Sequence, residues 1–192
     1  MIWSEPVIAD ALVRQTFNRK YVVVVPNCNW TGNECDLLAV TEKLRIIDVE
    51  IKISRADLKA DAIKNKWWHQ GFSYRPWAGE TAPPRPPREW PPKVWKHYYA
   101  MPKEIWKPEL MDSLPSKASG VILLSEMKHP HPPAVAVVWR RATPNRDAKP
   151  ISHEAVIDIA RLANLRMWAA IMERRKAAED YQQVISQMKV AA

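Results

Sequence analysis

Two acidic side chains and a lysine, Asp36, Glu50 and Lys52, have the types and spacing that metal-assisted hydrolysis requires. Two apolar runs, 37–40 and 44–53, flank the polar turn 41–43, and this pattern predicts a β-hairpin. Polar residues alternate with Val and Ile in the second run, so Glu50 and Lys52 share one face of that strand. Antiparallel pairing would bring Asp36, at the start of the first strand, back to this face. We therefore expect the three side chains to converge.

Such a cluster suits Mg²⁺ or Mn²⁺, because Mg²⁺ is bound through a few carboxylate oxygens and keeps waters and substrate phosphate in its shell. A bound ion lowers the pKa of its water and offsets negative charge on the reacting phosphate. Lys52 could orient that water or stabilise the developing charge. The alternative explanation of the alternating polarity is an ordinary surface hairpin with solvated charges, and the spacing alone leaves both open.

The residues around the hairpin carry a resemblance to a known superfamily. The hairpin resembles the core motif of the PD-(D/E)XK nucleases, because thirteen residues separate Asp36 from the tripeptide Glu50-Ile51-Lys52. The flanking segments 32–37 and 49–58, followed by Asp61 and 66–67, are similar to the MmcB-like DNA-repair nucleases, and more loosely to archaeal-type Holliday-junction resolvases. The likeness covers roughly residues 4–72. One departure is Glu34, which stands where such proteins often have a basic residue.

The resemblance implies a metal-dependent deoxyribonuclease that hydrolyses phosphodiester bonds in DNA repair, recombination or mobile-element DNA processing. It implies that Asp36 and Glu50 bind Mg²⁺ or Mn²⁺, that the backbone carbonyl of Ile51 joins them, and that Lys52 steers or activates the water. It also implies that Glu5, on the first helix, completes the metal site, although Glu5 would equally complement the helix dipole. Asp57 and Asp61 would support the site from the following helix.

The elements that must position these residues predict an α/β fold: a single domain with a mixed central sheet flanked by helices, as in the restriction-endonuclease-like core, and a long C-terminal helix. We expect residues 1–150 to form the nuclease-like domain and 151–192 a C-terminal helical extension. The predicted order is a helix from Glu5, a buried strand over 21–25, the hairpin, and a helix over 55–67. Further strands near 97–101, 119–125 and 134–140 follow, and then a helix capped by Ser152.

A Pro/Trp-rich insertion at 73–95 interrupts this pattern, because its proline density excludes helix and sheet interior. Arginine alternating with tryptophan suits single-stranded nucleic acid, where phosphates pair and bases stack. An arm that packs on its own domain or a second subunit, or a proline-rich ligand for another module, explains it as well. The residues expected to contact nucleic acid, here and near the motif, are Asn29, Trp30, Arg55, Lys59, Arg75, Trp77, Arg85 and Arg88.

The formal net charge of +8 over 192 residues favours an anionic partner, and we expect DNA. Two cysteines, Cys28 and Cys35, fit neither a disulfide scaffold nor a zinc pattern. The first residues do not read as a leader and no apolar run reaches membrane length, so we expect a cytoplasmic, nucleoid-associated protein without membrane contact. A homodimer could form through the C-terminal helix or the arm. The rival functions are a catalytically silent nuclease-fold module that binds nucleic acid or inhibits a protein, and a protein adaptor built on the arm.

Overall fold

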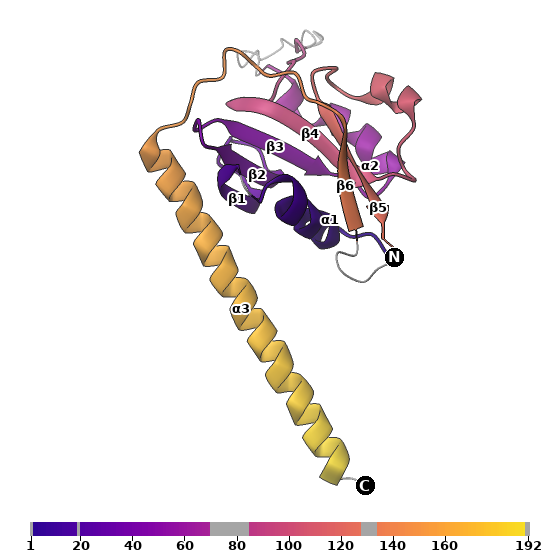
Figure 1. Cartoon of the computed structure of the whole chain (residues 1–192), viewed down its shortest axis with the longest axis vertical. Helices are drawn as coiled ribbons and strands as arrows, with labels where there is room; N and C mark the ends of the chain where they lie inside the picture. Colours follow the sequence, from indigo (N-terminus) through magenta and orange to yellow (C-terminus); the bar gives the residue numbers. More distant parts are fainter. Residues whose placement is uncertain (1, 19, 70–84, 128–133, 191–192) are drawn as a thin grey trace, which may run out of the picture.

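A six-stranded sheet with helices on both faces forms the body of the computed structural model, and one long helix projects from it (Figure 1). The structure describes residues 2–18, 20–69, 85–127 and 134–190. Its elements are α1 (Glu5–Ala11), η1 (Leu12–Thr16), β1 (Tyr21–Cys28), β2 (Cys35–Thr41), β3 (Ile46–Ile51), α2 (Arg55–Ala60), η2 (Asp61–Ile63), η3 (Asn65–Trp67), β4 (Val94–Pro102), η4 (Pro108–Ser113), β5 (Gly120–Glu126), β6 (Ala134–Arg140) and α3 (His153–Val190).

The strands lie in chain order, from β1 to β6. The pairs β1–β2, β2–β3 and β5–β6 are antiparallel, whereas β3–β4 and β4–β5 are parallel. Each parallel pair needs a crossover, and the segment containing α2, η2 and η3 lies in the crossover between β3 and β4. The predicted α/β domain with a mixed central sheet and a long C-terminal helix is confirmed.

Alternate residues of the central strands pack on opposite faces of the sheet. Tyr98 and Ala100 lie with Ile8 and Leu12 under α1 and η1, whereas Tyr99 faces a second cluster. That second cluster joins α2, η3 and η4 to β4 and β5. The first turns of α3 cover the same side of β1 to β3, where Ile159 is fully buried. The sheet is therefore apolar on both faces, and a charged side chain on β3 must be buried.

The hairpin matches its prediction closely. Leu37 pairs with Val49, and the register extended by one residue sets Asp36 opposite Glu50. The turn is longer than the apolar pattern indicated, because Leu44 has a φ of 55° and β3 begins only at Ile46.

The prediction of one helix over 55–67 was wrong. Ser54 caps α2 as a helix start, since its side chain accepts the N–H of Asp57, but α2 ends at Ala60. Two short 3₁₀ turns follow, separated by Lys64 in an extended conformation. The spacing of the apolar residues suggested that one face of a continuous helix is buried, but Ile63 is 79 % exposed. The break turns both Lys64 and Lys66 toward β3.

The boundary of the Pro/Trp-rich insertion also needs correction. Val94 and Trp95 are the first residues of β4 and pair with β3, so the insertion ends before them. Its part at 70–84 lies outside the described residues. In the part that is described, Arg88 donates its N–H to the Trp67 carbonyl, and Trp90 donates its indole N–H to the Thr143 carbonyl. These contacts hold the end of the insertion on its own domain.

The helix α3 begins after Ser152, whose hydroxyl accepts the N–H of Ala155 as predicted. Beyond its first turns it leaves the sheet, and its C-terminal half lies away from the domain (Figure 1). Leu165 and Trp168 are consequently more than half exposed. Among the described helices, none is long and apolar enough to cross a bilayer.

Candidate active site

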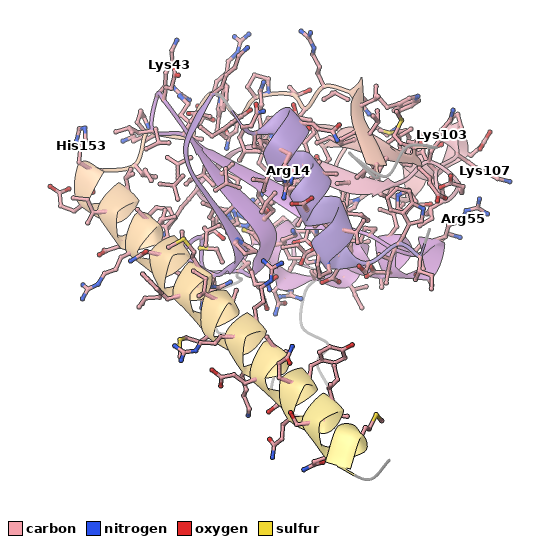
Figure 2. The ribbon with its side chains drawn as sticks, turned by 60° about the horizontal axis from the view of Figure 1, so that its bottom comes forward. Arg14, Lys43, Arg55, Lys103, Lys107 and His153 are labelled. Carbon is pink, nitrogen blue, oxygen red and sulfur yellow. The ribbon has the colours of Figure 1, made fainter. Side chains whose placement is uncertain are left out.

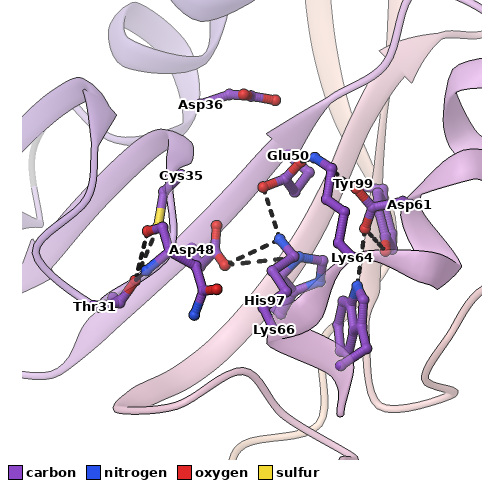
Figure 3. A network of polar contacts seen from close by, with 12 residues as sticks. Thr31, Cys35, Asp36, Asp48, Glu50, Asp61, Lys64, Lys66, His97 and Tyr99 are labelled. Carbon is purple, nitrogen blue, oxygen red and sulfur yellow. Dashed lines mark hydrogen bonds and ion pairs between the residues drawn. The ribbon is translucent and has the colours of Figure 1, made fainter. Parts of the chain in front are cut away.

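The segment from Glu50 to Lys52 is the centre of the site. The Lys52 ammonium lies 3.0 Å from Glu50 Oε2, so these two side chains meet on one face of β3 as predicted. The carboxylate of Asp36 accepts the main-chain N–H of Ile51, the residue between them, at 2.6 Å. Asp36 is thus tied to the backbone of the motif, while Figure 3 shows its side chain apart from the dashed contacts that surround Glu50, so the expected convergence of the three side chains is only partial.

Glu50 is the hub of a buried network of acids and lysines (Figure 3). Its Oε1 lies 2.7 Å from the Lys66 ammonium, and its Oε2 lies 2.8 Å from Lys64 and 3.0 Å from Lys52. Lys52 and Lys64 also pair with Asp61, at 3.0 and 2.9 Å. Lys66 lies 3.5 Å from the third acid, Asp48. Three buried carboxylates therefore face three ammonium groups, and the partly exposed Asp57 adds a fourth carboxylate 3.6 Å from Lys52.

The aromatic side chains around the network supply further hydrogen bonds to Asp61, whereas Asp48 Oδ1 is buried without a hydrogen-bond partner among the described residues. Asp61 accepts the hydroxyl of Tyr99 at 2.6 Å and the indole N–H of Trp67 at 3.0 Å. The ring of His97 stacks edge-on against both aromatic rings and lies 3.4 Å from the Lys66 ammonium. Because buried charges are stable only when paired and hydrogen-bonded, this shell helps to bury five of the six charged groups, all except Lys64.

Burial and the neighbouring charges perturb the protonation of these groups in opposite directions. Burial raises the pKa of Asp48 to about 6 in spite of Lys66. Burial would raise the pKa of Glu50 too, but the ammonium of Lys66 and then that of Lys52 hold it below its ordinary value. Burial and the Lys66 charge lower the pKa of His97 well below its usual range, so the ring is neutral. Glu50 is therefore an ionised carboxylate, although it is wholly buried.

Asp36 lines a separate pocket at the end of β2. The walls of this pocket come from α1, the β1 end, β3 and α3, and include Glu5, Asn27, Ile51 and Glu173. Glu5 therefore lies on the Asp36 side of the site, as the resemblance implied. The helix α3 reaches this pocket because Arg166 donates to the Pro26 carbonyl.

The donor chemistry of the site fits a hard divalent cation in part. Asp36, the Ile51 carbonyl and Glu5 supply oxygen ligands, and Mg²⁺ uses only one or two carboxylates beside waters and phosphate. Within the described part of the chain, no three His, Cys, Asp or Glu side chains are close enough to hold an ion by themselves. Both oxygens of Glu50 are occupied by ammonium groups, so an ion at Glu50 must displace a lysine. Lys64, with 45 % of its side chain exposed against 2 % for Lys52 and Lys66, is the one free to move out.

Of the six described residues that we expected to contact nucleic acid, four have partners within the domain. The Trp30 ring packs on the core below α3 and lies 4.8 Å from the Lys93 ammonium. Arg55 donates to the carbonyls of Ile105 and Glu104. Asn29 and Lys59 are exposed. Arg85 bonds the Asn65 side chain, Arg88 donates to the Trp68 carbonyl, and Arg75 and Trp77 lie outside the described residues.

Sequence reasoning missed several members of the network, above all Lys64, Lys66 and His97. Asp48 had a signal, because it alternates with Glu50 on the polar face of β3. The resemblance included Lys66, and the neighbouring lysines were the expected partners of Asp61, but a continuous helix would have pointed Lys64 and Lys66 to different sides, so their contact with Glu50 was not expected. Their inward position depends on the extended residue at 64.

The titration of Asp36 offers a test of this geometry. Burial raises the pKa of Asp36 to about 6, and the negative charge of Glu50 adds to the effect. We expect the carboxyl carbon of Asp36 to titrate near pH 6 in NMR spectra recorded without metal. Because ionisation is disfavoured in the folded state, this group should cost stability as pH rises from about 4 to about 6. Glu50→Gln should lower the midpoint, and an unchanged midpoint near 4 in both proteins would contradict the placement of Asp36.

Comparisons with known proteins support the fold and indicate no function. No family model matches the chain, and no curated protein matches it. One solved structure is similar along most of its length, the SPO1766 protein of unknown function from Silicibacter pomeroyi. It covers 88 % of both chains with a TM-score of 0.50 and 16 % sequence identity. A likeness at this identity shows a shared α/β architecture and nothing about chemistry.

Proposed function

We propose that the protein is a metal-dependent deoxyribonuclease of the PD-(D/E)XK type that hydrolyses phosphodiester bonds in DNA. The observation that supports this most directly is the bond from the Ile51 N–H to the Asp36 carboxylate, because it joins the first acid of the motif to the Glu50–Lys52 segment. The net charge of +8 and the sequence resemblance favour DNA as the substrate. A protein with this role would work at the nucleoid.

Asp36 and Glu50 would hold Mg²⁺ or Mn²⁺, assisted by the Ile51 carbonyl and by Glu5 from α1. When bound, the ion would supply Lewis-acid stabilisation of charge on the phosphate and a more acidic water. The side chains of the network have a different task. Lys66 and Tyr99 hold Glu50 and Asp61 in fixed positions, so that the site is preorganised before substrate arrives.

Lys52 and Lys64 would share the role that the motif assigns to one lysine, which is to position the reacting groups and to stabilise charge on the phosphate. Both bridge Glu50 and Asp61, but Lys52 is 2 % exposed and cannot reach a phosphate without rearrangement. Lys64 is 45 % exposed in the same bridge and can turn to a phosphate oxygen while Lys52 keeps the acids paired. Lys52 would then orient Glu50, and Lys64 would contact the substrate.

A catalytically silent module on the same fold is the second candidate. The observation that favours it is the charge balance of the network, since every Glu50 oxygen already has an ammonium partner. Such a closed network would serve stability alone, and the protein would bind nucleic acid or a protein without cleaving either.

Cleavage assays separate the two candidates. Supercoiled plasmid, single-stranded, flapped and branched DNA would each be incubated with Mg²⁺ or Mn²⁺, and in parallel with a chelator. Metal-dependent strand breaks on any of these substrates support the nuclease. Unbroken DNA at micromolar protein with both metals, together with retained binding, supports the silent module.

A further inference from the structure

A basic and aromatic surface lies at the opposite end of β3 from the candidate active site. Two adjoining hollows share Lys43 and Trp95 at the turn of the β2–β3 hairpin. Arg45 and Arg146 line one hollow, and Lys20 lines the other. We call Lys20, Lys43, Arg45, Trp95, Lys96 and Arg146 the hairpin-end surface. Arg45 precedes Glu50 by five residues of extended chain, which puts this surface about 17 Å from Glu50.

The cations of this surface are arranged around one aromatic ring. The Lys96 ammonium lies 4.6 Å from the centre of the Trp95 ring, and the Arg45 guanidinium carbon lies 5.7 Å from it. Arg45 also donates to the Ala148 carbonyl at 2.8 Å, which fixes its position. Burial and the charge of Arg141 lower the pKa of Lys96, so positive charges are crowded here. Trp95 therefore acts as a support that holds two cations in place.

These cations lack the acidic partners that the active-site lysines have. Within the described residues, Lys20, Lys43, Lys96 and Arg146 form no ion pair with any carboxylate. Glu42 is the one acid among the residues that line the two hollows. The three lysines of the network are neutralised by acids, so the excess positive charge of the protein must be displayed elsewhere. Uncompensated cations on a firm support are suited to the phosphates of a polyanion.

The turn that presents them is held in a single conformation. Leu44 has a φ of 55°, which is uncommon for a residue with a side chain. Its N–H donates to the Thr41 carbonyl at 2.9 Å, and its own carbonyl accepts the N–H of Ile151 at 2.8 Å. The Thr41 hydroxyl accepts the N–H of Arg45 at 3.0 Å. The backbone carrying Lys43 and Arg45 is therefore ordered before any partner binds.

We propose that the hairpin-end surface binds the phosphate backbone of nucleic acid, independently of sequence and of any divalent metal. Lys43 and Arg146, both exposed, contact phosphates directly, and Arg45 and Lys96 supply charge from the Trp95 ring. At about 3.4 Å of duplex per base pair, the surface lies on the order of five base pairs from Glu50. One duplex could reach both places, but binding here does not depend on cleavage there.

A matched pair of charge reversals tests the assignment. The surface variant is Lys43→Glu with Arg146→Glu, and the control is Lys103→Glu with Lys107→Glu. All four residues are exposed, and both variants change the net charge equally. Figure 2 shows Lys43 at one end of the domain and Lys103 and Lys107 at the other. Binding of a fluorescent random duplex of about 20 base pairs would be titrated in a chelator at several salt concentrations, so that cleavage plays no part.

We expect the surface variant to weaken binding at least tenfold and to reduce the salt slope by about two, because two phosphate contacts are lost. The control variant should change the affinity by less than about threefold. Equal losses in the two variants would mean that net charge alone attracts DNA, and an unchanged surface variant would also overturn the proposal. If wild-type protein binds polyglutamate as tightly as DNA of the same charge, the partner is an acidic protein and the nucleic-acid assignment fails. Because no metal is present, a failed cleavage assay leaves this result standing.

Discussion

Asp36→Ala is expected to reduce metal-dependent DNA cleavage about a thousandfold or more, and Glu50→Ala should do the same. Each substitution removes a carboxylate proposed to hold the ion, and a loss of about 4 kcal/mol of transition-state stabilisation corresponds to that factor. Neither acid carries positive charge, so binding of duplex in a chelator should stay within a few-fold of wild type. The rate of plasmid nicking and the duplex affinity, measured on the same preparations, check both parts.

The control for this result is Asp112→Ala. Asp112 and its partner Lys117 are exposed, at 83 % and 79 %, so the substitution removes an aspartate without touching the site. Its nicking rate should equal that of wild type. Wild-type cleavage by Asp36→Ala would remove Asp36 from the metal site. If Glu50→Ala loses its fold together with its cleavage, Asp36→Ala is the deciding variant, because Asp36 is only half-buried and lies outside the ion-pair network.

The hairpin and the sheet were predictable because their signal is local. Alternating polarity in β3 and a β-branched run in β1 require only that neighbouring residues face opposite sides. The pairing of Glu50 with Lys52 follows from the same alternation. What a single strand imposes on its own side chains can be inferred from the sequence.

The network around Glu50 was not predictable, because it depends on contacts between distant segments. Lys64 and Lys66 reach β3 only because the chain after Ala60 abandons the α-helix, and helical spacing gave the opposite indication. His97 and Tyr99 lie beside Asp48 and Glu50 only because β4 pairs in parallel with β3. Trp95 was assigned to the Pro/Trp-rich insertion on composition, whereas strand pairing makes it the support of the hairpin-end surface.

The division of the lysines between two tasks follows from their burial. Lys52 and Lys66, which neutralise acids, are buried beneath α2 and η3, whereas the cations of the hairpin-end surface gather at one turn without ion pairs among the described residues. The net charge of +8 is therefore not spread evenly over the surface. A polyanion would be attracted first to the hairpin end, and the active site would contribute little to the encounter until Lys64 moves.

Lys66→Met is expected to destabilise the protein by roughly 3–5 kcal/mol, because removing one partner of a buried ion pair leaves uncompensated charge. Lys66 is 2 % exposed and lies 2.7 Å from Glu50 and 3.5 Å from Asp48. In a chain of this size the loss corresponds to a melting temperature lower by on the order of 10 °C. Urea unfolding at pH 7 measures it directly.

Lys117→Met is the matched control, since it removes a lysine from an exposed pair and should cost less than about 1 kcal/mol. The pH dependence supplies a second check with a definite sign. Without the Lys66 charge, the pKa values of Asp48 and Glu50 rise, so both acids are more easily protonated in the folded protein. Protonation removes the uncompensated charge, and the deficit of Lys66→Met relative to wild type should therefore be smaller at pH 5 than at pH 8. A deficit that is equal at the two pH values, or no larger than that of Lys117→Met, would mean that the Lys66 contacts do not carry the stability assigned to them here.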